Sequence, residues 1–121
     1  MYVDGFVIPV PKGNKAKFKE MAEKIAPLFI EHGASRVVEC WGSDVPDGKV
    51  TDFRRAVAAE NGEEVVFSWV IWASKDAREA GNKKIMEDPR MRPPPGADMP
   101  FDGKRMIFGG FEAIVDVGGK A

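Results

Sequence analysis

The segment Glu63–Trp72, with the sequence EEVVFSWVIW, constrains the fold more than any other part of the chain. β-Branched and aromatic residues fill it almost without interruption, and only Ser68 breaks the apolar run. A strand with one face in solvent alternates apolar and polar side chains, whereas this segment does not. We therefore expect a central β-strand whose two faces are both covered.

The length and composition favour a single domain over residues 1–121. The 18 basic and 19 acidic residues nearly cancel, which disfavours a nucleic-acid partner. The single cysteine, Cys40, excludes an internal disulfide and fits a reducing compartment. The chain starts without the features of a signal peptide, and no apolar segment approaches transmembrane length. We therefore expect a cytoplasmic protein that has no membrane partner.

Hydrophobic periodicity and turn residues predict the other elements. They are a strand at Tyr2–Val10, a helix at Asn14–His32 kinked at Pro27, a strand at Ala34–Ser43, an extended segment at Phe53–Ala59, a helix at Lys75–Asp88 and a strand at Lys104–Val117. Asn14 and Ser74 are the expected N-caps, and Gly33 is the expected stop of the first helix. The Asn61-Gly62 turn is expected to fold Phe53–Ala59 back along the central strand.

The order β-α-β-β-α-β predicts an α+β fold of the ferredoxin-like class. Two right-handed crossovers place both helices on one face of a four-stranded antiparallel sheet. The other face is then apolar and uncovered, which favours a homodimer that packs two sheets into a dimeric α/β barrel. We expect Trp41 and Phe108 in this interface. The alternative is a monomer whose open face is partly covered by the segment Pro89–Gly103.

Five stretches of the sequence carry a resemblance to a known family. They are MYVDGFVIPVP, WGSDVPDGKVTDFRRAV, EEVVFSW, NKKIMEDPRM and MPFDGKRMIFGGFE. Over Met1–Asp116 the chain resembles a family of short uncharacterised bacterial proteins, the YbaA-like domain-of-unknown-function family. That family resembles the dimeric α/β-barrel superfamily, which also holds the antibiotic-biosynthesis and heme-degrading monooxygenases. The resemblance implies a ferredoxin-like protomer and a barrel dimer, and it implies no established activity.

Carboxylates on otherwise apolar strands are the strongest candidates for chemistry. Asp4, Glu39 and Glu112 each lie between apolar or small neighbours within a predicted strand. A buried carboxylate is costly unless it is paired, and burial raises its pKa toward the working range of a general base. If their faces line the barrel, they surround a cavity with other polar residues, namely Ser68, Arg36 and Arg105. The alternative places them near strand ends, in structural ion pairs or in water.

The leading hypothesis is a site for a small organic ligand inside each half of the barrel. Apolar pockets with a few polar contacts are the usual form of such sites. The expected ligand-binding residues are Asp4, Phe6, Glu39, Trp41, Ser68, Trp69, Phe108 and Glu112. A barrel interior that is completely filled by side chains would contradict this hypothesis.

The segment Pro89–Gly103 holds five of the nine prolines and is long for so small a domain. Such a connection is often a lid, and Arg90, Arg92 and Phe101 are its candidate contact residues. A stiff structural connector is an equally good interpretation. The basic residues of this region also suggest another hypothesis, an interaction module without chemistry that contacts an anionic partner.

A cofactor-independent monooxygenase is the remaining hypothesis, and it rests on resemblance at the level of the fold alone. The heme-degrading relatives use a histidine on the second helix, but Lys75–Asp88 contains none. His32, the single histidine, ends the first predicted helix, where a cation complements the helix dipole. Motifs for hydrolysis, phosphate binding and zinc binding are absent from the sequence. We therefore expect no cofactor and no metal, and the sequence does not decide whether the chain is an enzyme.

Overall fold

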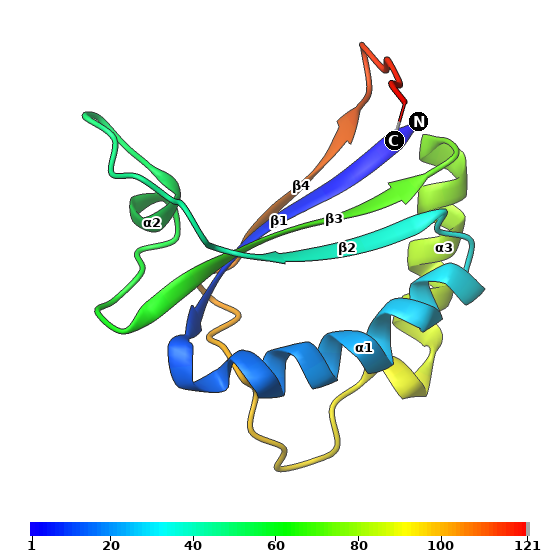
Figure 1. The fold of residues 1–121 in the computed structure, drawn as a ribbon. Coiled ribbons are helices and arrows are strands. Elements are labelled where there is room, and N and C mark those ends of the chain that lie inside the picture. Colours follow the sequence, from blue (N-terminus) through cyan, green and yellow to red (C-terminus); the bar gives the residue numbers. More distant parts are fainter. Residues whose placement is uncertain (121) are drawn as a thin grey trace.

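The computed structural model describes residues 1–120, and Ala121, the last residue of the predicted tail, lies outside the described residues. The chain forms an α+β fold in which a single antiparallel sheet is packed against helices (Figure 1). The elements in chain order are β1 (Tyr2–Pro11), the 3-10 turn Lys12–Asn14, α1 (Lys15–Glu31), β2 (Arg36–Trp41), α2 (Phe53–Ala56), β3 (Glu63–Trp72), α3 (Lys75–Glu87), the 3-10 turn Pro89–Met91 and β4 (Ile107–Glu112).

The four strands lie in the order β2-β3-β1-β4. β3 pairs with β1 along its whole length, from Glu63 opposite Pro11 to Trp72 opposite Tyr2, and it pairs with β2 on its other side. The prediction that Glu63–Trp72 is an inner strand is therefore confirmed. No helix within residues 1–120 is both long and apolar enough to span a membrane.

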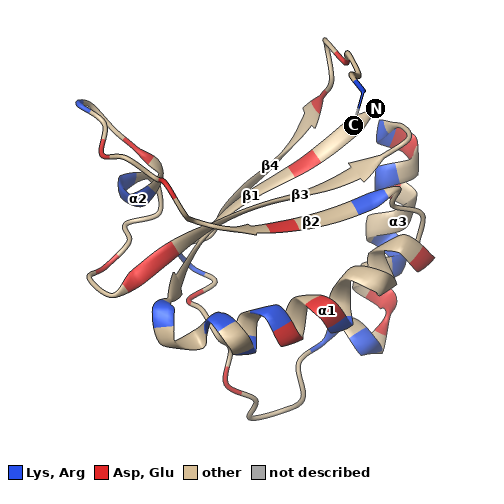
Figure 2. Ribbon diagram, in the orientation of Figure 1, with Lys and Arg blue, Asp and Glu red and all other residues tan. Residues whose placement is uncertain are grey.

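Both long helices, α1 and α3, lie on the same face of the sheet (Figure 1). Alternate residues of the inner strands point toward them, and the core forms there in two groups. The first group is Ile8, Val10, Phe18 and Val66, and the second is Ala34, Val70, Trp72 and Ile85. Figure 2 shows that charged residues gather on the helices and connections, whereas most of each strand is uncharged.

Two short signals in the sequence start or end the helices as predicted, and a glycine inside α3 allows its close packing. The Ser74 hydroxyl accepts a hydrogen bond from the Ala77 amide and caps α3. Gly33, which follows α1, has a φ of +110°, a conformation that favours glycine. Gly81 lies directly against the Trp72 ring, so that a larger side chain there would collide with it. The small residues of α3 thus allow its close approach to the sheet.

The prediction of an extended Phe53–Ala59 paired with the central strand is wrong. Asp52 accepts a hydrogen bond from the Arg55 amide and starts the short helix α2 instead. The Asn61-Gly62 turn is present, and Gly62 has a φ of +84°. It leads back to β3 from this helical excursion rather than from a paired strand. The cap at Asp52 thus favours a helix where the pattern of residues favoured an extended segment.

Two smaller expectations also differ from the structure. The last strand, predicted at Lys104–Val117, is limited to Ile107–Glu112. Asn14 occupies the N-cap position of α1 without capping it, because its side-chain amide donates to the carbonyl of Pro100 at 3.0 Å. This bond ties the proline-rich segment to the start of α1, an interaction between distant residues that local sequence does not reveal.

The sheet face opposite α1 and α3 is covered only at one end. There, Val57 of the excursion 42–62 packs with Val7 and Val65. Along the rest of this face large apolar side chains remain in solvent, among them Phe67, which is 46% exposed, and Phe111, which is 61% exposed. We call this surface the open face.

Candidate ligand cavity

The structure contains a hollow of about 210 Å³ between the sheet and α1, which we call the inner hollow. Its walls are apolar side chains from β1, α1, β2, β3 and the segment 91–106. They are Phe6, Ile8, Phe18, Met21, Ala22, Ile25, Ala26, Phe29, Val37, Val70, Met91, Phe101 and Met106. Only two polar residues, Glu39 and Ser68, line it. The inner hollow thus has the composition of a small-ligand site.

A second hollow of about 300 Å³ adjoins the first between α1 and β2, and we call it the outer hollow. The two share a wall that consists of Phe18, Ala22, Ala26, Val37 and Glu39. Trp41 lines the outer hollow from β2, and Lys15 and Lys19 line it from the first turns of α1. The inner and outer hollows together form what we call the cavity.

Glu39 is the titratable residue common to both hollows. It lies on β2 directly opposite Ser68 of β3, so the register places both side chains on the face that α1 covers. Burial raises the pKa of the Glu39 carboxyl above its ordinary value, and a hydrogen bond from the Ser68 hydroxyl opposes this rise. Glu39 is nevertheless exposed to solvent, on the edge strand β2. A carboxyl of this kind can donate or accept a hydrogen bond, depending on its protonation.

The structure brings together five of the residues predicted for a site. Phe6, Glu39, Ser68 and Phe101 line the inner hollow, and Trp41 lines the outer one. The other predicted residues, which do not line the cavity, are Asp4, Trp69, Phe108, Glu112, Arg90 and Arg92.

Trp69 and Phe108 lie on opposite faces of the sheet. Trp69 lies on the open face, where its ring packs 5.6 Å from that of Phe67. Phe108 pairs with Phe6 across β1 and β4, and the two rings stack at 6.4 Å. Phe108 and Trp41 therefore share the face of the sheet that carries the helices. The open face, where we had expected Trp41 and Phe108, is built from Phe67 and Trp69 instead.

Asp4 holds β1, β3 and α3 together. Its carboxylate accepts a hydrogen bond from the Trp72 indole at 2.9 Å and pairs with the Arg78 guanidinium, also at 2.9 Å. The Arg78 guanidinium also lies over the ring of Tyr2. Because Asp4 is almost completely buried and its partners are protein groups, this network explains the carboxylate by structure alone. Glu112, opposite Tyr2 at the end of β4, is exposed.

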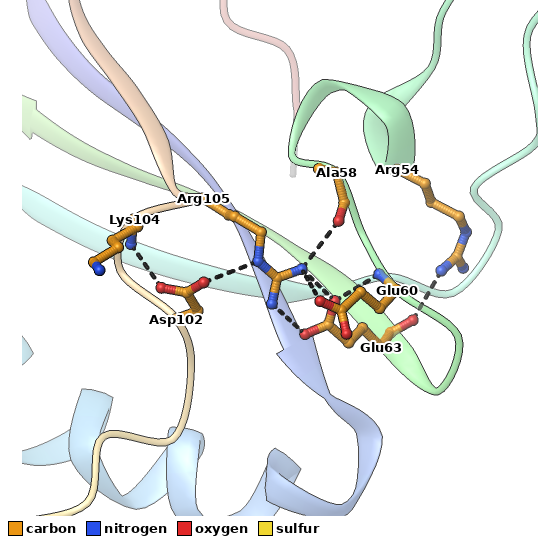
Figure 3. Close-up of polar contacts among 7 residues, drawn as sticks. All are labelled: Arg54, Ala58, Glu60, Glu63, Asp102, Lys104 and Arg105. Carbon is orange, nitrogen blue, oxygen red and sulfur yellow. Dashed lines mark hydrogen bonds and ion pairs between the residues drawn. The ribbon is translucent and has the colours of Figure 1, made fainter.

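Arg105, which we had expected near a cavity, is the centre of an ion-pair network at the far end of the sheet (Figure 3). Its guanidinium donates to both carboxylate oxygens of Glu63, at 2.6 and 2.8 Å, and to Asp102 at 3.1 Å. It also donates to the carbonyl of Ala58, whose φ of +49° is uncommon for a residue with a side chain. We call Ala58, Glu60, Glu63, Asp102 and Arg105 the Arg105 cluster.

The Arg105 cluster joins the excursion 42–62 to β3 and to the segment before β4. Hydrogen bonds from Arg105 lower the pKa of the Glu63 carboxyl below its ordinary value. Arg105, Glu63 and Asp102 each have protein partners in this network, which leaves them little capacity for a ligand. Arg36, the other arginine expected near a cavity, is exposed on the edge strand β2.

Within residues 1–120, Glu31, His32 and Asp88 are the group whose spacing best fits a metal ion. Arg90 occupies the same place, because its guanidinium pairs with both Asp88 and Glu31. The Arg90 and His32 side chains lower the pKa of the Asp88 carboxyl well below its ordinary range. A cation would have to displace the Arg90 charge, so the residues present favour an ion-pair cluster over a metal centre.

The sequence-based choice of site residues missed the α1 side of the cavity. Phe18, Ala22 and Ala26 belong to the apolar stripe of this helix, which the sequence shows only as a core-facing pattern. Lys15 and Lys19 were polar positions beside that stripe. Small alanines among larger apolar residues are the signal that could have indicated room between α1 and the sheet.

Comparison with known proteins identifies a family and relatives that have no stated activity. Residues 1–103 match the profile of a family described as "Protein of unknown function (DUF1428)". The chain is 65% identical over 115 residues to "Uncharacterized protein YbaA" of Escherichia coli strain K12, with 95% of this chain and 97% of that protein covered. The protein of the same name from Shigella flexneri matches with the same identity and coverage. These names state no activity, so a function has to be argued from the cavity.

Proposed function

The chain belongs to the DUF1428 family of proteins of unknown function, and we propose that it binds a small organic ligand in the cavity beneath the sheet. The observation that carries this proposal is the pairing of Glu39 and Ser68 in an otherwise apolar inner hollow. Ligand sites typically combine apolar walls with a few polar groups that fix the orientation of the ligand. The cavity has this composition, whereas the Arg105 cluster does not.

The shape of the cavity supports a ligand of modest size. The outer hollow measures about 300 Å³, at the lower end of the volumes typical of small-molecule sites, and the inner hollow is smaller at about 210 Å³. Phe18, Val37 and Trp41 offer flat or branched apolar surfaces to it. In this proposal Glu39 and Ser68 form the polar end of the site and bind a hydroxyl, carbonyl or amine of the ligand.

Blocking the cavity tests this function. Ala22 lines both hollows, so Ala22→Phe fills them, whereas Ala16→Phe places the same ring on an exposed position of α1. We expect wild type and Ala16→Phe to bind members of an aromatic fragment library in ligand-observed NMR, and Ala22→Phe to lose them. Equal binding by Ala22→Phe and wild type, with both folded by circular dichroism, would overturn the proposal.

We further propose that the chain is a ferredoxin-like protomer that forms a homodimer, a dimeric α/β barrel, through the open face. Phe67 and the half-buried Trp69 of β3, with Ile107 and Phe111 of β4, form an apolar surface on the two strands that flank β1. Exposed apolar surfaces of this kind mark interaction sites, and a self-complementary sheet face suits a twofold interface. The packed sheets would bury both faces of β3, which suits its mostly apolar sequence.

Sedimentation velocity of charge variants tests the dimer. Phe67→Glu puts a charge on the open face, and Ile30→Glu puts one on an apolar residue of α1 with a similar exposed fraction, 47% against 46%. We expect wild type and Ile30→Glu to sediment as dimers and Phe67→Glu as a monomer. A wild-type monomer at high micromolar concentration would refute the dimer and leave the ligand cavity unaffected.

A further inference from the structure

Two lysines and two glutamates line the outer hollow, and the lysines lie together on the first turns of α1. Lys15 and Lys19 line it one helical turn apart on α1, and Glu23 lies one turn further on. Among the described residues neither lysine forms an ion pair, although Lys24 and Glu20 on the same helix do. Two ammonium groups without an ion-pair partner therefore line the outer hollow, together with the carboxyl groups of Glu23 and Glu39.

Lys15 is held at the outer hollow. Its ammonium lies 5.4 Å from the centre of the Trp41 ring, a distance typical of a cation–π contact. The contact keeps the flexible lysine over the aromatic wall of the outer hollow instead of in bulk solvent. An ammonium group in this position can meet an anion whose attached ring or alkyl group lies against Trp41.

The cavity then changes in character along its length. Lys15 and Lys19 line the outer hollow, and Phe18, Val37 and Glu39 belong to the wall that it shares with the inner hollow. Ser68 lies opposite Glu39 and lines the inner hollow. A neutral apolar ligand would leave the lysines unused, and a cationic ligand would be repelled by them. An anionic group on an apolar body fits all three parts.

We propose that the cavity binds a small amphipathic carboxylic acid, with its carboxylate at Lys15 and Lys19 and its aromatic or branched body against Trp41 and Phe18. This proposal rests on the ligand-binding function proposed above and specifies the ligand class of the same site. It orients the ligand as well, since the end opposite the carboxylate points toward Glu39 and Ser68. A hydroxyl or carbonyl at that end of the ligand would form hydrogen bonds with Glu39 and Ser68.

A pair of probes that differ only in charge tests the ligand class. 1-Naphthoic acid and 1-naphthamide have nearly the same shape, and only the acid is anionic at pH 7. We expect wild type to bind the acid about tenfold more tightly than the amide by isothermal titration calorimetry. The preference of wild type for the acid should shrink as salt is raised, because exposed charges are screened.

Charge variants show where the preference arises. The double variant Lys15→Met/Lys19→Met keeps most of each side-chain stem, so we expect it to lose the preference for the acid while still binding the amide. The matched control is Lys17→Met/Lys83→Met, which removes two exposed lysines that do not line the cavity. The control should keep the wild-type preference for the acid.

The outcomes separate this proposal from the function on which it rests. Equal affinity of wild type for the acid and the amide, with both displaced by Ala22→Phe, would overturn the acid class and retain the ligand site. Retention of the acid preference in Lys15→Met/Lys19→Met would also overturn it. Failure of both probes to bind wild type, together with no effect of Ala22→Phe on library binding, would overturn the cavity function itself.

Discussion

Glu63 and Glu39 lie on neighbouring strands of one sheet, and their surroundings shift the pKa values of the two carboxyl groups in opposite directions. At Glu63 the Arg105 guanidinium binds both carboxylate oxygens, which lowers the pKa of the carboxyl. At Glu39 burial raises the pKa, and the single compensating partner is the Ser68 hydroxyl. One carboxylate has its charge neutralised by the protein, and the other retains capacity for a further partner.

This difference separates a structural network from a candidate site. Polar groups whose hydrogen bonds are all made within the protein rigidify the fold and cannot bind much else. Polar groups in an open, mostly apolar cavity lower the stability of the folded chain, and they can form hydrogen bonds with a ligand. The Arg105 cluster belongs to the first kind, and the cavity around Glu39 belongs to the second.

The largest expected effect is the loss of the Glu63 charge. Glu63→Gln removes the paired charge from the buried end of β3, and we expect a loss of about 2 kcal/mol in the free energy of unfolding at pH 7. The control is Glu60→Gln, because Glu60 is exposed and lies 3.8 Å from the Arg105 guanidinium. Urea denaturation of both variants measures the difference, and equal destabilisation would contradict the assigned role of Glu63.

The dependence of folding stability on pH below 4.5 tests the same cluster, and the expected effect is of intermediate size. The pKa of Glu63 is lower in the folded chain than its ordinary value of 4.5, so its contribution is present above pH 4.5. It is lost as the pH falls from 4.5 through the lowered pKa. Glu63→Gln should therefore lose stability less steeply than wild type in this range. Parallel curves from thermal unfolding would show that Glu63 does not contribute to the acid transition.

The smallest expected effect has the opposite sign and concerns the cavity. The pKa of Glu39 is raised above 4.5 in the folded chain, so its ionisation destabilises the fold increasingly as the pH rises from 4.5, and fully above the raised value. Glu39→Gln should be more stable than wild type at pH 8, by less than about 1 kcal/mol because the side chain contacts solvent. The two proteins should converge below pH 4.5. A destabilised Glu39→Gln at pH 8 would mean that Glu39 has a structural partner in the folded chain.

The pattern of apolar residues was sufficient to predict most of the elements, because helix and strand periodicity are local properties. The inner strand β3, the cap at Ser74 and the glycine after α1 follow from a few adjacent residues. The same reasoning failed for Phe53–Ala59, where the Asp52 side chain competed with an extended backbone. Local signals of comparable strength can favour different structures, and the tertiary context selects one.

The candidate site was predicted only in part. Alternation along β2 correctly placed Glu39 and Trp41 on one face, and both line the cavity. Asp4 could not be distinguished from Glu39 by the same argument, because its neutralising partner Arg78 lies 74 residues away in the chain. Whether a carboxylate on a strand is structural or available depends on such distant partners.

The sequence by itself determined that this chain builds a sheet with a mostly apolar inner strand and two amphipathic helices. Those features depend on the spacing of residue types along a few turns or pleats. The tertiary structure alone decided that Arg105 neutralises Glu63, 42 residues away, and that α1 leaves a hollow above Glu39. Contacts of this kind arise from strand register and helix packing, which bring distant side chains together and are not encoded in any single stretch.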